Sequence, residues 1–387
     1  MAEKYLVEPD VGFIEEVARL GGGDLKKCFQ CATCSVACTI SPDNKPFPRK
    51  EMIAASWGLK DRLVANHDIW LCHNCGDCTA KCPRGAKPGD VLGAIRAYAV
   101  ADYAIPKFLG KAVNDPKMLP VLLLIPAALF VVVGFILNAV FGPMFETTFL
   151  NFAPTGEEIA QAKFIHTTLV DVIMIPAFFF AVVVFALGLK RFIADIHADA
   201  IRTGKTDQKE LDLVAVGKAL FQAIPTILAH RKFKECGENK DRSSAHLMVL
   251  FSFISLFIVT NIFFIALYIL GQPGPYSQLN PVKWLANIAG VALVIGGFLL
   301  VKKRLDKKDQ VSSYKDWYLL GLVLALGLTG LGTEITRLAG WGAVSYTIYF
   351  LHLLFVFSLF AYTPFSKLAH LVYRTVALTY DAYISRK

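Results

Sequence analysis

The chain has 387 residues, of which 55% are hydrophobic and 18% are charged, and its formal net charge is +9. This composition excludes a disordered chain and is untypical of a single soluble globule. A basic surplus in so apolar a chain indicates membrane topology, so we expect no nucleic-acid partner. Eight of the nine cysteines fall between Cys28 and Cys82. The sequence therefore predicts a cysteine-rich head, residues 1–117, followed by an apolar membrane body, residues 118–387.

Two cysteine runs with the same internal spacing define the head. They are Cys28, Cys31, Cys34 and Cys38, then Cys72, Cys75, Cys78 and Cys82. A cubane iron–sulfur cluster needs four thiolates, and in two-cluster ferredoxins the fourth cysteine of each run ligates the other cluster. We therefore expect two [4Fe-4S] clusters. Their ligands are Cys28, Cys31, Cys34 and Cys82 for cluster 1, and Cys72, Cys75, Cys78 and Cys38 for cluster 2. Zinc or disulfides are the alternatives, although a structural zinc site uses only four ligands.

Helical patterns around the cysteines predict an α-helical ferredoxin-type frame. Residues 48–59 and residues 91–103 have apolar positions at helical spacing. The first residues carry no hydrophobic signal segment, so we expect the head to stay in the cytoplasm, where structural disulfides are rare. His67 and His73 flank the second run. We expect them to face solvent or to lie behind the ligands, because the cysteines already complete both clusters.

Six apolar segments follow, each about as long as the 17–25 residues that cross a bilayer. They are residues 118–141, 164–189, 246–270, 284–301, 317–333 and 341–363. The connections 190–245 and 302–315 are rich in lysine and arginine, whereas 142–162 and 271–282 contain neither. The positive-inside rule then places both termini and the head on the cytoplasmic side of the inner membrane. The predicted fold is all-α, a ferredoxin-type domain followed by a six-helix transmembrane haem b bundle.

The loop 190–245 carries an amphipathic pattern over residues 210–230, with a break near Pro225. Such a pattern predicts a helix lying on the inner membrane face. His197 and His230 fall in the same loop, and we expect both at the surface.

Four histidines at or near membrane depth are candidate axial ligands of two b haems. A bis-histidine haem needs two imidazoles from different helices at one depth. His166 and His352 lie toward the outer side, so we pair them for an outer haem, and we pair His246 with His370 for an inner haem. His352 and His370 are eighteen residues apart, so one continuous helix would place both on one face. A packed polar residue or a proton relay is the alternative role for any one of them.

Three charged residues are candidates for a quinone and proton site. Asp171 is a carboxylate well inside a predicted span, and Glu334 and Arg337 lie one turn apart near the outer end of the fifth span. Quinol oxidation releases protons, and a carboxylate near a haem can accept them. The alternatives are a helix–helix hydrogen bond for Asp171 and an interfacial ion pair for Glu334 and Arg337.

Both halves of the chain resemble known protein families. The cysteine-rich head, with Ile69-Trp70 before the second run, resembles the C subunit of heterodisulfide reductase. The segment from His352 to His370 resembles the last haem helix of the membrane subunit of respiratory nitrate reductase. Heterodisulfide-reductase-type cytochrome b subunits are similar around Arg231, Phe233, Cys236 and His246-Leu-Met. A fusion of these halves resembles the C subunits of quinone-interacting membrane-bound oxidoreductase (Qmo) complexes.

The resemblance implies the quinone-interacting subunit of an oxidoreductase complex in sulfate respiration, a chain that by itself mainly transfers electrons. It implies exchange with menaquinone in membrane lipid, and two heterodisulfide reductase A-like flavoprotein subunits and adenylylsulfate reductase as partners. The nearest alternative is the membrane subunit of a heterodisulfide reductase-type quinone or methanophenazine complex, and a non-haem membrane anchor is another. Nitrate reductase relatives carry two haem histidines on one early helix. That helix here has only His166, so His246 must come from a different one.

Overall fold

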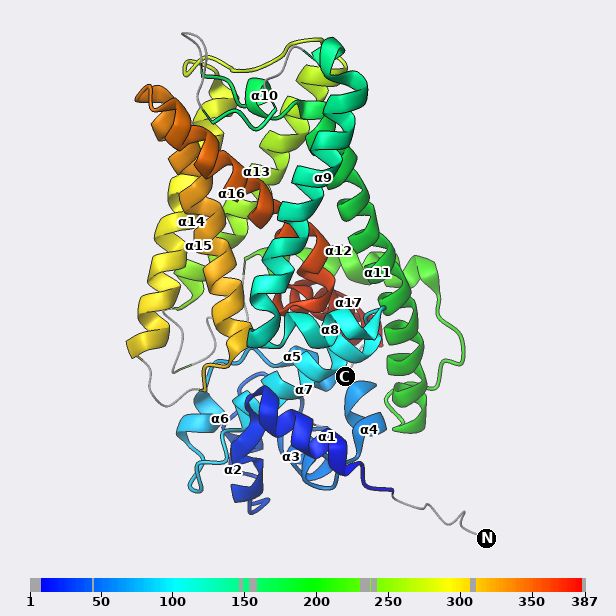
Figure 1. Cartoon of the computed structure of the whole chain (residues 1–387). Helices are drawn as coiled ribbons and strands as arrows, with labels where there is room; N and C mark the ends of the chain where they lie inside the picture. Colours follow the sequence, from blue (N-terminus) through cyan, green and yellow to red (C-terminus); the bar gives the residue numbers. More distant parts are fainter. Residues whose placement is uncertain are drawn as a thin grey trace.

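A computed structural model shows the chain as helical, in line with the predicted fold class (Figure 1). The structure describes residues 8–43, 45–145, 149–152, 159–229, 237, 242–306 and 311–384. Long helices stand side by side in a bundle, and short helices gather as a head at one end of it. Four residues of the sequence analysis lie outside the described residues, and these are His230, Arg231, Phe233 and Cys236.

The head is built from short helices. They are α1 (Val11–Val17), α2 (Thr33–Val36), α3 (Arg49–Ser56), α4 (Lys60–Val64), α5 (Asp68–Leu71), α6 (Asp77–Ala80), α7 (Pro88–Tyr103) and α8 (Lys107–Val113). The predicted helices 48–59 and 91–103 are confirmed as α3 and α7. Pro88 opens α7 because the first turn of a helix needs no amide donor. Asp10 caps α1 by accepting a hydrogen bond of 2.8 Å from the Phe13 amide.

The six predicted spans are confirmed as helices long and apolar enough to cross a membrane. They are α9 (Leu119–Phe145), α11 (Thr167–Arg202), α13 (Arg242–Tyr268), α14 (Pro281–Asp306), α15 (Tyr314–Leu338) and α16 (Gly342–Tyr362). A short helix, α10 (Gln161–Phe164), precedes α11. Many leucine, isoleucine, valine and phenylalanine side chains on these helices are exposed, as lipid-facing side chains are.

The second long helix runs well past its predicted end at Leu189. It has 36 residues, which at 1.5 Å per residue span about 54 Å, more than a bilayer core needs. Its last turns enter the head, where Phe192 and Ile196 are buried beside Trp70. Part of the expected loop 190–245 is therefore a rigid extension of α11 that the head packs around.

The sixth long helix does not continue to His370. α16 ends at Tyr362, two 3-10 turns follow, and a separate helix, α17 (His370–Tyr383), begins. Pro364 at the break lacks the amide that a continuing helix would need. The expectation of His352 and His370 on one face of a single helix is therefore wrong. α17 turns toward the head, where Tyr373 stacks on Trp70 with ring centroids 5.4 Å apart.

The amphipathic helix expected at residues 210–230 is confirmed as α12 (Leu213–Leu228), with Pro225 inside it. The Asp212 side chain caps α12, accepting from the Val214 amide at 2.9 Å. Leu213 and Phe221 are among its exposed apolar residues. Its position on the inner membrane face stays a prediction.

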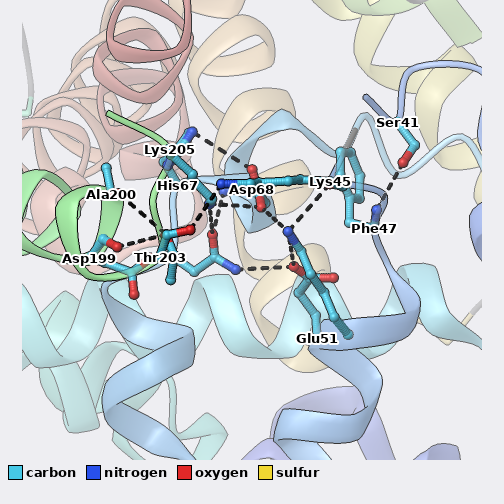
Figure 2. Close-up of polar contacts among 12 residues, drawn as sticks. Ser41, Lys45, Phe47, Glu51, His67, Asp68, Asp199, Ala200, Thr203 and Lys205 are labelled. Carbon is cyan, nitrogen blue, oxygen red and sulfur yellow. Dashed lines mark hydrogen bonds and ion pairs between the residues drawn. The ribbon is translucent and has the colours of Figure 1, made fainter. Parts of the chain in front are cut away.

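An ion-pair network centred on the buried Asp68 fastens the head to the end of α11 (Figure 2). Asp68 is fully buried and pairs with Lys50 at 2.6 Å and with Lys205 at 2.9 Å. Lys45 donates to the Thr203 carbonyl at 2.9 Å. Burial raises the pKa of the neighbouring Glu51 to about 7. Buried pairs of this kind fix position more than they add stability.

Two histidines of the head region are more buried than the sequence suggests. His67 is fully buried and meets Tyr380 edge-on, with centroids 5.3 Å apart, so the solvent-facing alternative is wrong. The expected surface position of His197 is also wrong. Its ring is buried between the Tyr380 hydroxyl at 2.9 Å and the Lys209 carbonyl at 3.2 Å, because the extended α11 places it beside α17.

Candidate metal and cofactor sites

The two cysteine runs follow the same backbone course. Two residues after the first cysteine, Gln30 and Asn74 are left-handed, with φ of 57° and 52°. Two residues further, Ala32 and Gly76 are left-handed as well, with φ of 68° and 93°. Each run then forms a single helical turn, α2 or α6. Left-handed residues so close together wrap the chain tightly, which brings neighbouring cysteines to one side.

Backbone amides point at the cysteine sulfurs. The Gln30 amide donates to Cys28 Sγ at 3.4 Å, the Asn74 amide to Cys72 Sγ at 3.3 Å, and the Ala86 amide to Cys82 Sγ at 3.4 Å. All eight cysteines of the two runs are free thiols. Hydrogen bonds to ligand sulfurs are among the features that tune iron–sulfur clusters. The residues present therefore fit cluster ligation.

The thiols of the two runs interact across the runs as well as within them. Cys34 interacts electrostatically with Cys28 and Cys82. In the other group, Cys38 interacts with Cys72 and Cys75. The last cysteine of each run thus lies within electrostatic reach of at least one cysteine of the other run. This is the arrangement that the crossed ligand sets require, and the ligation itself stays a prediction.

Burial controls the protonation of the inner thiols. It raises the pKa of Cys34 to about 11 and of Cys38 to about 12. Such thiols become thiolates only when a metal binds them. Among the residues that the structure describes, no three metal-binding side chains gather around a single-ion position.

The inner pair of predicted haem histidines meets at a cavity between head and bundle. The cavity measures about 280 Å³, and its lining includes His246 from α13, His370 and Arg374 from α17, and Cys72 and His73 from the head. His246 and His370 also interact electrostatically. A predicted ligand of cluster 2 and both predicted inner haem ligands therefore face one space.

His370 is held in the orientation of a metal ligand. Its Nδ1 lies 2.6 Å from the Lys367 carbonyl oxygen. A carbonyl can only accept, so Nδ1 carries the proton and Nε2 keeps a free lone pair. Metal-binding histidines almost always donate their other ring nitrogen in this way. Burial lowers the pKa of His370 to about 3, which keeps the ring neutral, as ligation requires.

Basic side chains surround the same cavity. They are Arg96, Arg304, Lys315, Lys367 and Arg374, against the two carboxylates Asp90 and Asp316. Asp316 is already neutralised by Arg304 at 3.3 Å and by Lys367. The remaining positive charge suits the two propionate carboxylates of a haem. The residues present therefore fit a b haem at this site.

The outer pair of histidines shows a different arrangement. His352 Nδ1 lies 2.9 Å from the Thr329 hydroxyl, which itself donates to the Ala325 carbonyl at 2.5 Å. His352 must therefore donate to Thr329, which leaves its Nε2 free. His166 Nδ1 instead accepts from the Thr168 amide at 3.2 Å, as the cap of α11. A neutral His166 in this position carries its proton on Nε2.

The three candidates for a quinone and proton site lie in two different places. Asp171 accepts a hydrogen bond from Tyr268 and interacts with Tyr349, one turn before His352. Glu334 pairs with Lys283 at 2.9 Å and with Arg337 at 3.0 Å. The structure thus shows the interfacial ion pair that the sequence left as an alternative for Glu334. A role of these residues in proton transfer stays a prediction.

Sequence reasoning missed the residues that surround the histidines. Thr329 and Lys367 were not singled out, because a threonine in a span and a lysine at its inner end are common. Thr329 stands in a GLTGLG segment, and small residues in a span indicate a close helix contact. That pattern would have found the helix face against which His352 packs, since a Cβ at Gly330 would lie 3.2 Å from its ring.

Known proteins match the head and, in one case, nearly the whole chain. Residues 24–86 match the 4Fe-4S dicluster domain family. The C subunit of H(2):CoB-CoM heterodisulfide,ferredoxin reductase from Methanothermobacter marburgensis is 32% identical over 122 residues, 28% of this chain and 65% of the relative. A protein of Archaeoglobus profundus that is named for its likeness to the heterodisulfide reductase C subunit is 32% identical over 106 residues, 27% of this chain and 56% of that protein. The chain thus spans less than two thirds of either relative.

A third relative extends into the membrane body. Citrate utilization protein B of Escherichia coli is 25% identical over 393 residues, which cover 97% of this chain and 92% of the relative. No solved structure matches the chain significantly. The chain is therefore a helical iron–sulfur protein with a 4Fe-4S dicluster domain and six candidate transmembrane helices, and its head is similar to subunits of oxidoreductase complexes.

Proposed function

We propose that this chain is a membrane electron-transfer subunit that links menaquinol or menaquinone to a redox partner in the cytoplasm. The observation that carries the proposal is the shared cavity of His246, His370 and Cys72. It brings a predicted haem site directly against a predicted cluster ligand. When bound, two b haems and two [4Fe-4S] clusters supply one-electron carriers along the chain.

The chain's own residues position and insulate these carriers. His246 and His370 would hold the inner haem, and the basic lining of the cavity would hold its carboxylates. Trp70 is fully buried and stacks on Tyr373, which packs the space between head and bundle with aromatic rings. Packed apolar side chains keep water away from the cofactors, as a defined potential requires.

The outer haem is proposed on His352 with His166. His352 already offers Nε2, because Thr329 holds its other nitrogen. His166 must turn its ring and release the Thr168 amide before it can bind metal, since its Nδ1 is engaged. Asp171, one turn along α11 from His166, accepts the quinol proton in this proposal, with Tyr268 as its hydrogen-bond partner.

The proposed partners follow from the head. Its likeness to heterodisulfide reductase C subunits supports a cytoplasmic oxidoreductase partner. In the Qmo-like form of the proposal, two heterodisulfide reductase A-like flavoproteins pass electrons to adenylylsulfate reductase. The nearly full-length match to citrate utilization protein B favours a second candidate, an electron-transfer subunit in citrate utilization. The neighbouring genes decide between the two.

Quinol-driven reduction of the purified chain tests the proposal. A soluble menaquinol analogue is added anaerobically to the oxidised protein, and the haem absorption and the cluster EPR signals are followed together. The proposal expects haem reduction within mixing time and cluster signals after it. A quinol that leaves haem and clusters oxidised, in a protein that dithionite reduces fully, would contradict it.

A further inference from the structure

Two large apolar side chains of the head project into solvent beside predicted cluster 1. Phe29 is 67% exposed and Val36 is 87% exposed. Both belong to the first cysteine run, and Cys31 between them is itself exposed. Large apolar side chains grouped around an exposed reactive site indicate a surface that another molecule covers.

The second run serves as an internal control for this exposure. Its cysteines have the same spacing, and its backbone is left-handed at the same two positions. The two runs can therefore be compared position by position. His73 replaces Phe29 and faces the cavity, and Ala80 replaces Val36. The backbone of a cluster loop therefore does not demand large apolar side chains at these places. Their presence in the first run calls for a different cause.

Arginines flank the exposed pair. The Arg84 guanidinium lies over the Phe29 ring, 4.1 Å from its centroid. Arg49 donates to the Gln30 carbonyl at 2.9 Å, and its charge acts on the Cys31 thiol. Of the acids nearby, Asp24 is neutralised by Lys27 at 2.6 Å and by Lys87 at 3.3 Å. We call Phe29, Cys31, Val36, Arg49 and Arg84 the first-run face, and it has an apolar centre with a basic rim.

We propose that the first-run face docks a redox protein whose surface has an apolar centre and an acidic rim. This inference rests on the proposed function, because it says where electrons leave or enter the head. One electron passes between cluster 1 and an iron–sulfur or flavin centre of the partner, and no bond in this chain changes. Exposed aromatic and arginine residues are typical of binding hot spots, and a basic rim steers an acidic partner.

Charge and position decide against other occupants. A second copy of this chain would bring arginine against arginine, which is repulsive. Lipid is also unsuitable, because α2 lies at the end of the head away from the long helices (Figure 1). The occupant is therefore a soluble protein or subunit. The two cysteine sets thus face different surroundings. Cys72 of the cluster 2 set lines the cavity, and Cys31 of the cluster 1 set faces solvent.

Photo-crosslinking in the native host tests the proposal on the full chain. The crosslinker p-benzoylphenylalanine replaces Val36 in one variant and Ala80, the equivalent exposed residue of the second run, in another. We expect an adduct from position 36 about tenfold stronger than from position 80, containing a protein that binds flavin or iron–sulfur. Arg84→Glu in the Val36 variant should weaken the adduct by about tenfold, because one rim charge is reversed. Full iron content of each variant shows that the head is folded.

Several outcomes would overturn the proposal. Equal adducts from both positions, an adduct with a second copy of this chain, or a captured protein without a redox centre would each do so. Full iron content with no adduct from position 36 would do so as well. The quinol experiment is done on the purified chain without any partner. Failure of docking and failure of the proposed function are therefore seen separately.

Discussion

The inner and outer ends of the membrane bundle hold their histidines in different ways. At the inner end, His246 and His370 face one cavity that Cys72 also lines. At the outer end, His352 is held by Thr329 of α15, whereas His166 caps α11. The side of the membrane alone sorts the four histidines into an outer and an inner pair. The hydrogen bonds of His370, His352 and His166 add the missing information, because they decide which ring nitrogen has a lone pair for metal.

Removing a proposed ligand of the inner haem should have the largest effect. His370→Ala is expected to lose one haem per chain. It should keep its non-haem iron, because the cysteines are untouched. His73→Gln is the matched control, since His73 lines the same cavity but is not a proposed ligand. Haem is counted as the pyridine haemochrome and iron by chelation. Unchanged haem in the His370 variant would rule out the inner site.

An equally large effect is expected at the clusters. Cys38→Ser should remove cluster 2 and Cys82→Ser should remove cluster 1, because each run supplies its fourth ligand to the other set. Each variant is expected to lose about four irons per chain. The two cluster signals are separated by EPR, and the cluster that faces the inner cavity is the one lost with Cys38. If each variant instead lost the cluster of its own run, the crossed ligand sets would be wrong.

The outer end gives the sharpest test of the pairing. His166→Asn keeps a side-chain oxygen that caps α11 but removes the metal ligand. The proposed pair predicts the loss of the outer haem, the same result as His352→Ala. A His166→Asn protein that keeps every haem would show that His166 is only a cap. His352 would then need another partner.

A smaller effect is expected from the residue that orients His352. Thr329→Val keeps the shape of the side chain and removes the acceptor for the His352 Nδ1 proton. Loss of such a partner weakens metal binding by about 10–100-fold. Haem occupancy after dilution measures it, with Thr347→Val as control, since that hydroxyl donates to the Ala343 carbonyl of its own helix. Equal haem retention in both variants would contradict the role of Thr329.

The smallest effect concerns the fastening of the head to α11. The pKa of Glu51 is raised from 4.5 to about 7, chiefly by burial. The folded state thus binds an extra proton, so the free energy of unfolding falls as pH rises from about 4.5 to 7. Glu51→Gln should remove this pH-dependent fall in the free energy of unfolding. At pH 8 the free energy of unfolding should rise by on the order of 2 kcal/mol, whereas at pH 5 it should change little.

Thermal loss of the cluster absorption at both pH values measures this effect. Glu15→Gln is the matched control, because Glu15 is exposed on α1 and such changes stay within about 0.5 kcal/mol. A Glu51 variant that gains equally at pH 5 and pH 8 would show that the carboxyl does not titrate in this range.

The repeated cysteine spacing and the long apolar segments could be predicted from the sequence. Eight cysteines at fixed spacing and six apolar segments specify the head and the bundle without tertiary information. The end of α11 was missed because Lys190 and Arg191 interrupt the apolar segment, although Phe192, Ile196 and Ala200 continue it at every fourth residue. That spacing is the signal that could have found the extension.

The histidine sites were predicted only in part, for physical reasons. Spacing placed His246 and His370 at the inner side, but the cavity between them is formed by head and bundle together. The break at Pro364 was expected to be part of one continuous helix, and its 3-10 turns are what carry the Lys367 carbonyl to His370. Hydrogen bonds between distant segments, such as His352 with Thr329, leave no trace in the spacing of residues.

The central claim is that the membrane body carries haem beside an iron–sulfur head. Optical spectra of the purified chain, oxidised and dithionite-reduced, with haem and iron counted per polypeptide, test it most directly. We expect two b haems and about eight non-haem irons. Eight irons without haem would leave the head standing but would contradict the claim, because the membrane body would then be an anchor with no electron path to quinone.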